Sequence, residues 1–187
     1  YALGLNYDLL TQDVVHQAKR CLLDALGCAI GAYEAEGRPI CEALVQEIGG
    51  PKEATVFGSG LRTSVLNATF VNSFLVRFLD SNDVGGGHNS DAVSGIIATS
   101  EREKASGSDL LTSLVISYEL GARVVSSLPG SYVAWSKKGW TTDTRGGLSM
   151  PPSLGKLMGL NEDQIANAIG ICASHALPLN ILDADRE

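Results

Sequence analysis

Three carboxylates and a histidine fall within twelve residues in one glycine-rich segment. The segment runs from Asp80 to Asp91 and contains Asp83, His88 and three consecutive glycines at 85–87. An imidazole beside carboxylates can act as a general acid or base near neutral pH. The glycines would let backbone N–H groups approach a ligand closely. We therefore predict a site that moves protons, with a solvated loop that caps a helix as the alternative.

The same segment nearly has the spacing of a calcium-binding EF loop. Asp80, Asn82 and Gly85 stand at the right positions. Val84 offers no side-chain oxygen at the fifth position, and Asp91 replaces the bidentate glutamate at the twelfth. Only one histidine is local, so a transition-metal site is no better supported. The prediction is a site without a metal, and calcium binding stays open as a minor hypothesis.

A second candidate lies at residues 137–143, where lysines and threonine hydroxyls surround a glycine. Such groups can bind a carboxylated substrate, and Thr142 is the predicted substrate-binding residue of this segment. The alternative is a surface loop anchored by Trp140. The two remaining histidines carry weaker signals. His16 is expected on the exposed side of a helix, and His175 near the end of the last one.

Helical periodicity dominates the elements that must position these residues. Apolar residues recur at three- and four-residue steps between Val14 and Ala29, which predicts an amphipathic helix. Residues 64–79 are apolar nearly all round, which predicts a central, buried helix that leads directly to Asp80. Further helices are expected at 39–48, 91–104, 109–128, about 147–158 and 162–176.

Local signals refine several of these boundaries. Asn89 or Ser90 is expected to cap the helix that follows the glycines. Asn161 and Gln164 form a predicted capping box for the last helix. The pair at 151–152, both proline, should fall in a first turn or bend the helix that contains it. Residues 54–58 could form a short strand or an extended link. The chain is thus predicted to be one all-α domain over 1–187, with mostly antiparallel packing of neighbouring helices.

Bulk composition excludes several classes of function. The chain is 44% hydrophobic and 19% charged, which is typical of a globular protein, and its net charge is −7. Binding to nucleic acid or to an anionic membrane usually needs a basic face, so neither partner is expected. The four cysteines form no Cys-x-x-Cys pair, which favours small buried thiols in a reducing compartment. We see no signal peptide and no membrane-spanning run, and expect a cytoplasmic protein.

The chain also resembles the MmgE/PrpD family, which includes 2-methylcitrate dehydratases, cis-aconitate decarboxylases and iminodisuccinate epimerase. The matching segments follow in order over nearly the whole chain: Ala18 to Cys28 (AKRCLLDALGC), Arg77 to Asp83 (RFLDSND), His88 to Asp91 (HNSD), Gly139-Trp140, Lys156 to Leu160 (KLMGL) and Ala166 to Ala176 (ANAIGICASHA).

The resemblance implies a large helical domain that is joined, in full-length family members, to a smaller α+β lid. We therefore expect a helical domain that is incomplete at its C-terminal end, without the lid. Members are usually homodimers, work without metal or organic cofactor and act on small di- and tricarboxylates. His88 matches the histidine of the family's His-Pro-Ser segment, and Asp80 matches the aspartate that opens the site loop. We predict that both are catalytic, with His88 as the acid/base and Asp80 as the group that orients it or contacts the substrate. Asp83 matches another acidic position, which we predict to bind substrate.

Four departures from the family pattern stand out. Asn89 replaces a usual proline, Val84 replaces a frequent threonine, Thr141 and Thr142 occupy a stretch that often holds a second histidine, and residues 151–152 interrupt a usually alanine-rich helix. The expected function is a lyase that abstracts a proton next to a carboxylate, with 2-methylcitrate dehydratase as the best guess. The alternatives are a decarboxylase or epimerase of the same family, or an inactive helical dimerisation module.

Overall fold

The structure, a computed structural model, describes residues 1–83, 88–127 and 145–175. This part is mostly helical, which confirms the predicted all-α class. The α-helices are α1 (Gln12–Gly31), α2 (Gly37–Ile48), α3 (Val65–Phe78), α4 (Val93–Glu103), α5 (Gly107–Ser126), α7 (Gly146–Leu157) and α8 (Glu162–His175). Two short 3-10 helices, η1 (Tyr7–Leu9) and η2 (Asn89–Ala92), precede α1 and α4.

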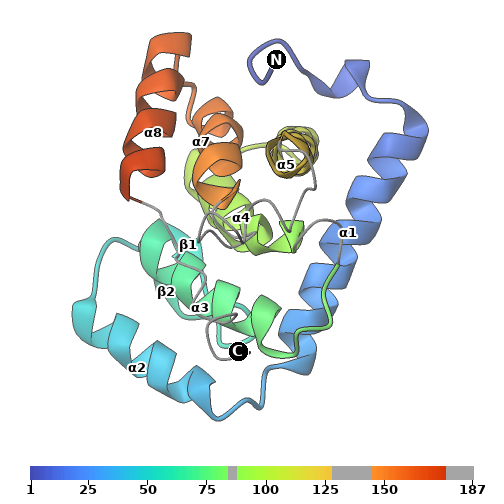
Figure 1. The fold of residues 1–187 in the computed structure, drawn as a ribbon. Helices are drawn as coiled ribbons and strands as arrows, with labels where there is room; N and C mark the ends of the chain where they lie inside the picture. Colours follow the sequence, from blue (N-terminus) through green and yellow to red (C-terminus); the bar gives the residue numbers. More distant parts are fainter. Residues whose placement is uncertain (84–87, 128–144, 176–187) are drawn as a thin grey trace, which may run out of the picture.

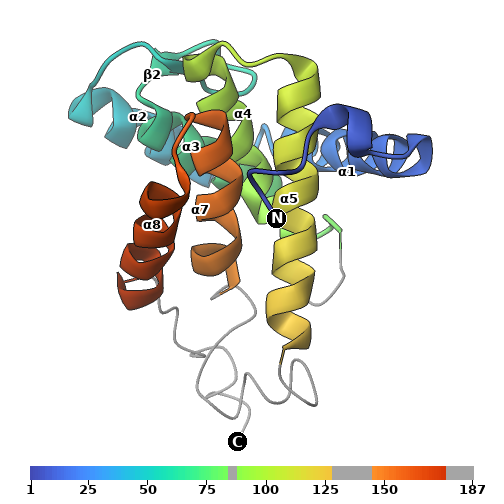
Figure 2. The ribbon, with the colours of Figure 1, turned by 90° about the horizontal axis from the view of Figure 1, so that it is seen from above.

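Helix α4 occupies the middle of the molecule, and the other helices surround it (Figure 1). On one side, α3 packs against α1, α2 and α4. On the other side, α5, α7 and α8 stand next to one another (Figure 2). The chain runs along α5, returns along α7 and reverses again along α8, so these three neighbours are antiparallel as predicted.

Small residues form much of the core and allow the helices to approach closely. Ala18, Ala25 and Ala29 on the buried side of α1 join larger apolar side chains of α3, α4 and α5 in one cluster. Leu75 and Leu114 in that cluster are almost fully buried. Burial of such side chains supplies the main favourable free energy of folding. The predicted amphipathic helix at 14–29 is confirmed, and it extends by two residues at each end.

Two buried hydroxyl groups join α5 to α7. The Oγ atoms of Ser113 and Ser153 lie 2.7 Å apart. Each hydroxyl also reaches the backbone carbonyl of the other residue, at 3.1 Å for Ser113 and 2.9 Å for Ser153. Buried polar groups need such partners, and here the partners fix the spacing of two helices.

A two-stranded antiparallel hairpin, β1 (Ala54–Thr55) and β2 (Arg62–Thr63), confirms the extended structure expected near residue 54. The fully buried Asn72 of α3 holds this hairpin. Its Oδ1 accepts from the N–H of Phe57 at 2.8 Å, and its Nδ2 donates to the carbonyl of Thr55 at 3.0 Å.

Capping side chains set the start of several helices. Asn161 and Gln164 form the predicted reciprocal capping box of α8, with hydrogen bonds of 2.9 and 3.0 Å between each side chain and the other backbone N–H. A second capping box, between Ser106 and Asp109, starts α5 at residue 107. The signal Ser-x-x-Asp was present in the sequence, but the helix was predicted to begin only at 109.

The prediction that the helix at 64–79 is apolar and buried nearly all round was wrong. Helix α3 is not buried all round, because Leu66 is 81% exposed and Phe70 and Phe78 are about half exposed. Its opposite side, which includes Val71 and Leu75, is fully buried.

The prolines at 151–152 lie in the second turn of α7, and both are buried. Of the two outcomes predicted for them, a first-turn position is excluded, and a bend in the helix stays a prediction.

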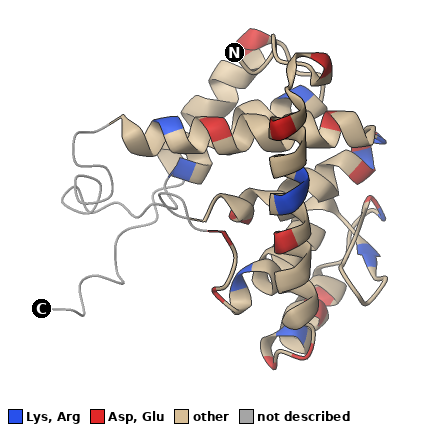
Figure 3. Cartoon of the chain, turned by 90° about the vertical axis from the view of Figure 1, so that its right-hand side faces the viewer, with Lys and Arg blue, Asp and Glu red and all other residues tan. Residues whose placement is uncertain are grey.

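Surface charge and hydropathy add two findings. Basic and acidic residues lie on several of the same helices, so the acidic excess is not gathered on one element of the described chain (Figure 3). No helix in the described ranges is long and apolar enough to cross a membrane. The four cysteines are free thiols, of which only Cys28 is buried.

Candidate functional site

The candidate site begins where α3 ends. Asp80 follows the last turn of α3 and has a left-handed backbone with φ of 50°. Side chains other than glycine rarely adopt this conformation, and aspartate is among the residues that tolerate it best. Unusual backbone of this kind tends to persist at functional positions. The turn it creates sends the chain toward α4.

Asp80 stands between an arginine and the histidine of the glycine-rich segment. Its Oδ1 accepts a 2.7 Å hydrogen bond from Nη1 of Arg77, one turn earlier on α3. The same oxygen lies 3.5 Å from Nε2 of His88. Asp80 is 72% exposed, whereas the His88 side chain is only 17% exposed. The structure therefore brings together the two residues predicted to be catalytic.

Polar contacts beneath this pair hold the segment in place. Nδ2 of Asn82 donates to the buried Oγ of Ser90 at 2.7 Å. Oδ1 of Asp83 accepts from the backbone N–H of Ser90 at 3.1 Å. The prediction that Asn89 or Ser90 caps α4 was wrong. The Ser90 hydroxyl is engaged by Asn82, and the 3-10 helix η2 intervenes before α4 begins at Val93.

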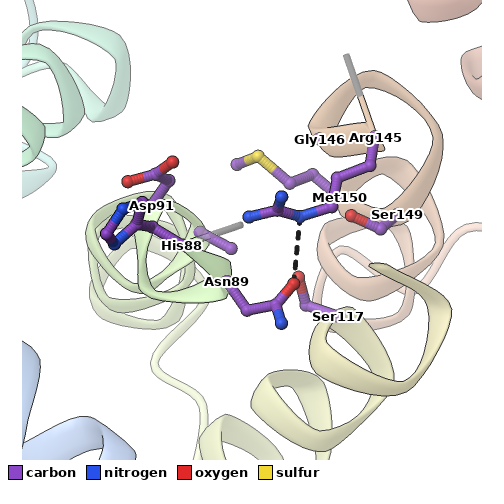
Figure 4. A pocket seen from close by; sticks show the side chains of 9 residues that line it. His88, Asn89, Asp91, Ser117, Arg145, Gly146, Ser149 and Met150 are labelled. Atoms are coloured by element: carbon purple, nitrogen blue, oxygen red, sulfur yellow. Dashed lines mark hydrogen bonds between the residues drawn. The ribbon is translucent and has the colours of Figure 1, made fainter. Parts of the chain in front are cut away.

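A small cavity opens beside His88. Nine residues line it, which come from η2 and its N-cap, from α5, and from α7 and its N-cap: His88, Asn89, Asp91, Ala92, Ser117, Arg145, Gly146, Ser149 and Met150. Its volume of about 30 Å³ is space for one or two water molecules. Figure 4 shows the Arg145 side chain extending from α7 across this cavity toward η2. A cavity of this size accommodates the end of a polar group and not a whole tricarboxylate.

The two ring nitrogens of His88 have different surroundings, and only Nε2 lies near a carboxylate. Its Nδ1 is buried and has no hydrogen-bond partner within the described part of the chain. Buried polar atoms without partners are rare and usually indicate a bound water, a ligand or a catalytic role. A histidine with one nitrogen near a carboxylate and the other unpaired can accept or deliver a proton.

Asp83 lies on another side of the segment. It contributes to a hollow of about 520 Å³ between α1 and the loop, together with Gln17, Arg20, Cys21 and other residues. It does not line the cavity beside His88. Burial, and secondarily the nearby Asp83 carboxylate, raise the pKa of the Tyr118 hydroxyl. Substrate binding by Asp83 stays a prediction.

The remaining predicted residues are placed as follows. Thr142, with the whole segment 137–143, lies outside the described residues. His16 and His175 are exposed, and neither lines the cavity beside His88. No group of three His, Cys, Asp or Glu side chains in the described ranges is arranged to hold a metal ion. The Asn82 side chain is occupied by Ser90 and Arg77, so calcium binding gains no support.

Two arginines of the site did not stand out in the sequence. Arg77 holds Asp80 and also lies 3.9 Å from Oδ1 of Asp91. It directly precedes the segment, within a stretch that matched the family, and its i, i+3 spacing to Asp80 was a usable signal. Arg145 is 4% exposed and donates from Nε to Oδ1 of Asn89 at 3.0 Å. Only the folding of the chain brings it there.

A model of the MmgE/PrpD N-terminal domain matches residues 1–185. The chain belongs to the MmgE/PrpD family. It is 29% identical to the 2-methylcitrate dehydratase of Salmonella typhi over 180 residues, which cover 89% of the chain and 37% of that protein. It is 27% identical to the 2-methylcitrate dehydratase of Escherichia coli K12, with the same coverage. It is 26% identical to the cis-aconitate decarboxylase of Aspergillus terreus, over 96% of the chain and 38% of that protein.

This MmgE/PrpD chain thus spans a little over a third of the length of the curated relatives it matches. Within that span lie a largely buried histidine, a carboxylate beside it and a buried guanidinium across a small cavity. These groups are the types needed to take a proton from an anionic substrate and to bind its negative charge.

Proposed function

We propose that this chain is the helical part of a lyase that acts on small di- or tricarboxylates. The reaction would begin with proton abstraction from a carbon next to a carboxylate, as in a 2-methylcitrate dehydratase. The observation that carries the proposal is the placement of His88, with Nε2 3.5 Å from Asp80 and its ring at the wall of a polar cavity. Membership of a family whose named relatives are dehydratases and decarboxylases supports it.

In the proposed step, His88 removes a proton from the carbon beside the carboxylate. The electrons of the broken C–H bond form a C=C double bond, and the C–O bond on the neighbouring carbon breaks. The protonated imidazole of His88 returns its proton to the departing hydroxyl, which leaves as water. Asp80 would orient the ring and stabilise its positive charge after proton transfer. We further propose that Thr142 donates a hydrogen bond to a substrate carboxylate and that Asp83 contacts a substrate hydroxyl.

The experiment is a substrate screen by proton NMR. Citrate, 2-methylcitrate, cis-aconitate and iminodisuccinate are each incubated with the protein in the presence of EDTA. The 187-residue chain and the longest translation product of its gene are tested in parallel. We expect loss of water from 2-methylcitrate without added metal or cofactor. Failure of both products to convert any of the four compounds would refute the proposal.

The compounds formed in the screen also distinguish the dehydratase from the other two activities of the family. A decarboxylase would convert cis-aconitate with release of carbon dioxide. An epimerase would exchange the proton next to the carboxylate with deuterium from the solvent and form no double bond. Either result would keep proton abstraction and replace the elimination step.

A second candidate function is a helical dimerisation module. It is favoured by large apolar side chains that stand exposed on α1, α2 and α3, including Leu23, Ile30, Ile40 and Leu66, each more than 70% exposed. Exposed apolar groups of this kind often belong to protein–protein interfaces. Light scattering after size-exclusion chromatography would show a homodimer, which we expect. A dimer without turnover in the screen would favour this module over the enzyme.

A further inference from the structure

A buried arginine and an asparagine join two distant parts of the chain at the cavity beside His88. Nε of Arg145, at the start of α7, donates to Oδ1 of Asn89 in η2 across 3.0 Å. Arg145 is 4% exposed, so its guanidinium is withdrawn almost completely from bulk water. A guanidinium is withdrawn from water only where other groups hold it, because its desolvation is unfavourable. A residue kept in such a place is a candidate for a functional role.

The neighbouring helix leaves room for this pair. Gly121 of α5 lies so close that a Cβ atom there would stand 2.6 Å from Oδ1 of Asn89. The same atom would lie 3.5 Å from Cδ of Arg145. Any side chain at 121 would therefore displace Asn89 or Arg145. Three elements, η2, α5 and α7, thus combine to hold one guanidinium in one position.

The surroundings of Arg145 suit a carboxylate. Its side chain extends across the cavity toward the turn that carries His88 (Figure 4). The hydroxyl-bearing residues Ser117 and Ser149 line the same space. A planar guanidinium has five N–H donors and binds carboxylates with matched geometry. A carboxylate could join or replace the other interactions of this side chain.

We propose that Arg145, positioned by Asn89, binds a carboxylate group of the substrate and places the adjoining carbon beside His88. This inference rests on the proposed function, because it assumes a substrate with carboxylates. It assigns a role to two residues that were not among the predicted catalytic or substrate-binding residues. Asn89 stands where the family usually has proline, which offers no side-chain acceptor to hold an arginine. The Asn89–Arg145 pair is therefore expected to distinguish this chain from relatives that keep the proline.

The test is binding of tricarballylate, a tricarboxylate without a hydroxyl to eliminate, measured by titration calorimetry. The uncharged triamide of the same acid serves as the control ligand. Arg145→Gln should weaken tricarballylate binding by about tenfold or more, since a charge-assisted contact is lost. Asn89→Ala should weaken it less, by about three- to tenfold, because the guanidinium remains but is no longer held. Arg123→Gln, which removes a surface arginine of α5, should leave binding unchanged.

Asn89→Asp keeps the inference testable if Arg145→Gln fails to fold. Aspartate would still hold Arg145, now as an ion pair, and would neutralise the charge that attracts the ligand. Thermal unfolding should show an intact fold for Asn89→Asp, while tricarballylate binding falls about tenfold. Tight binding by this variant, equal binding of the triamide, or no binding by the unchanged protein would each overturn the inference. Because this readout involves no turnover, the inference and the proposed lyase activity can fail separately.

Discussion

Nε2 of His88 lies 3.5 Å from Oδ1 of Asp80, and that oxygen also accepts a 2.7 Å hydrogen bond from Arg77. Arg77 lies in the last turn of α3, and Asp80 follows that helix. His88 directly precedes η2, eleven positions after Arg77. The arginine holds the carboxylate, and the carboxylate faces the imidazole. Substitutions of these three residues should therefore have different consequences, because only His88 among them lines the cavity.

His88→Ala should reduce turnover by about 10²-fold or more, as removal of an acid or base group usually does. The measurement is the rate of dehydration in the proton NMR assay at saturating substrate. His16→Ala, which changes an exposed histidine of α1, is the matched control and should retain the full rate. Near-normal turnover by His88→Ala would remove this residue from the mechanism.

Arg77→Gln should affect activity more than stability. The Arg77–Asp80 ion pair is largely solvated, with Asp80 72% exposed, so its loss should change the free energy of unfolding by less than about 1 kcal/mol. Turnover should fall by about five- to tenfold, because the carboxylate that orients His88 is released. Urea unfolding and the dehydration rate are measured on the same preparation. Arg123→Gln breaks a comparable exposed pair with Glu119 and should leave the rate unchanged. A rate equal to that of the control would contradict the positioning role.

Asn72→Ala should destabilise the fold by about 2–4 kcal/mol, since it leaves the N–H of Phe57 and the carbonyl of Thr55 without their partner. The free energy of unfolding from urea titrations provides the check. Asn6→Ala is the control, because Asn6 is exposed and makes no capping hydrogen bond. Equal stabilities of the two variants would show that Asn72 does not hold the hairpin.

Tyr118 should make stability decrease at alkaline pH. Its pKa is raised in the folded protein, first by burial and then by the charge of Asp83. Below a pH of about 10 the phenol is neutral in both states, so the contribution to stability is fully present. Above that pH the unfolded chain ionises and the folded protein does not, which costs up to about 1.4 kcal/mol per pH unit.

Tyr118→Phe should remove this part of the slope. Urea unfolding between pH 8 and 11 measures it as the difference between the unchanged protein and the variant. Tyr33→Phe controls for the loss of a phenol elsewhere. If Tyr118→Phe and the unchanged protein show the same pH dependence, the buried phenol is not the cause.

Much of the fold could be predicted from the sequence because its signals are local. The apolar repeat from Val14 to Ala29 and the capping box at Asn161 and Gln164 involve residues three or four positions apart. The exposed side of α3 could not be predicted in this way. Leu66 and Val71 are equally apolar, and only the placement of α1, α2 and α4 decides which of them is buried.

In the candidate site, too, residues close in the sequence could be predicted and residues far apart could not. Asp80 and His88 are eight residues apart, so residue types within one short segment indicated a site there, and the resemblance to the family selected these two. Arg145 is 56 residues from Asn89, and no local pattern connects them. For the Ser90 hydroxyl, a local signal gave a wrong prediction. Its position suggested a helix cap, but the side chain of Asn82 competes for it.

The reciprocal serine contact between α5 and α7 has a consequence for how this chain could diversify. Ser153 lies on α7 about two turns after Arg145, and Ser113 and Gly121 are equally far apart on α5. Adding a single methyl group at either serine would push the two helices apart at that point and tilt the arginine relative to His88. In the proposed lyase, the substrate range could therefore change through a substitution that touches no substrate and lies about two helical turns from Arg145.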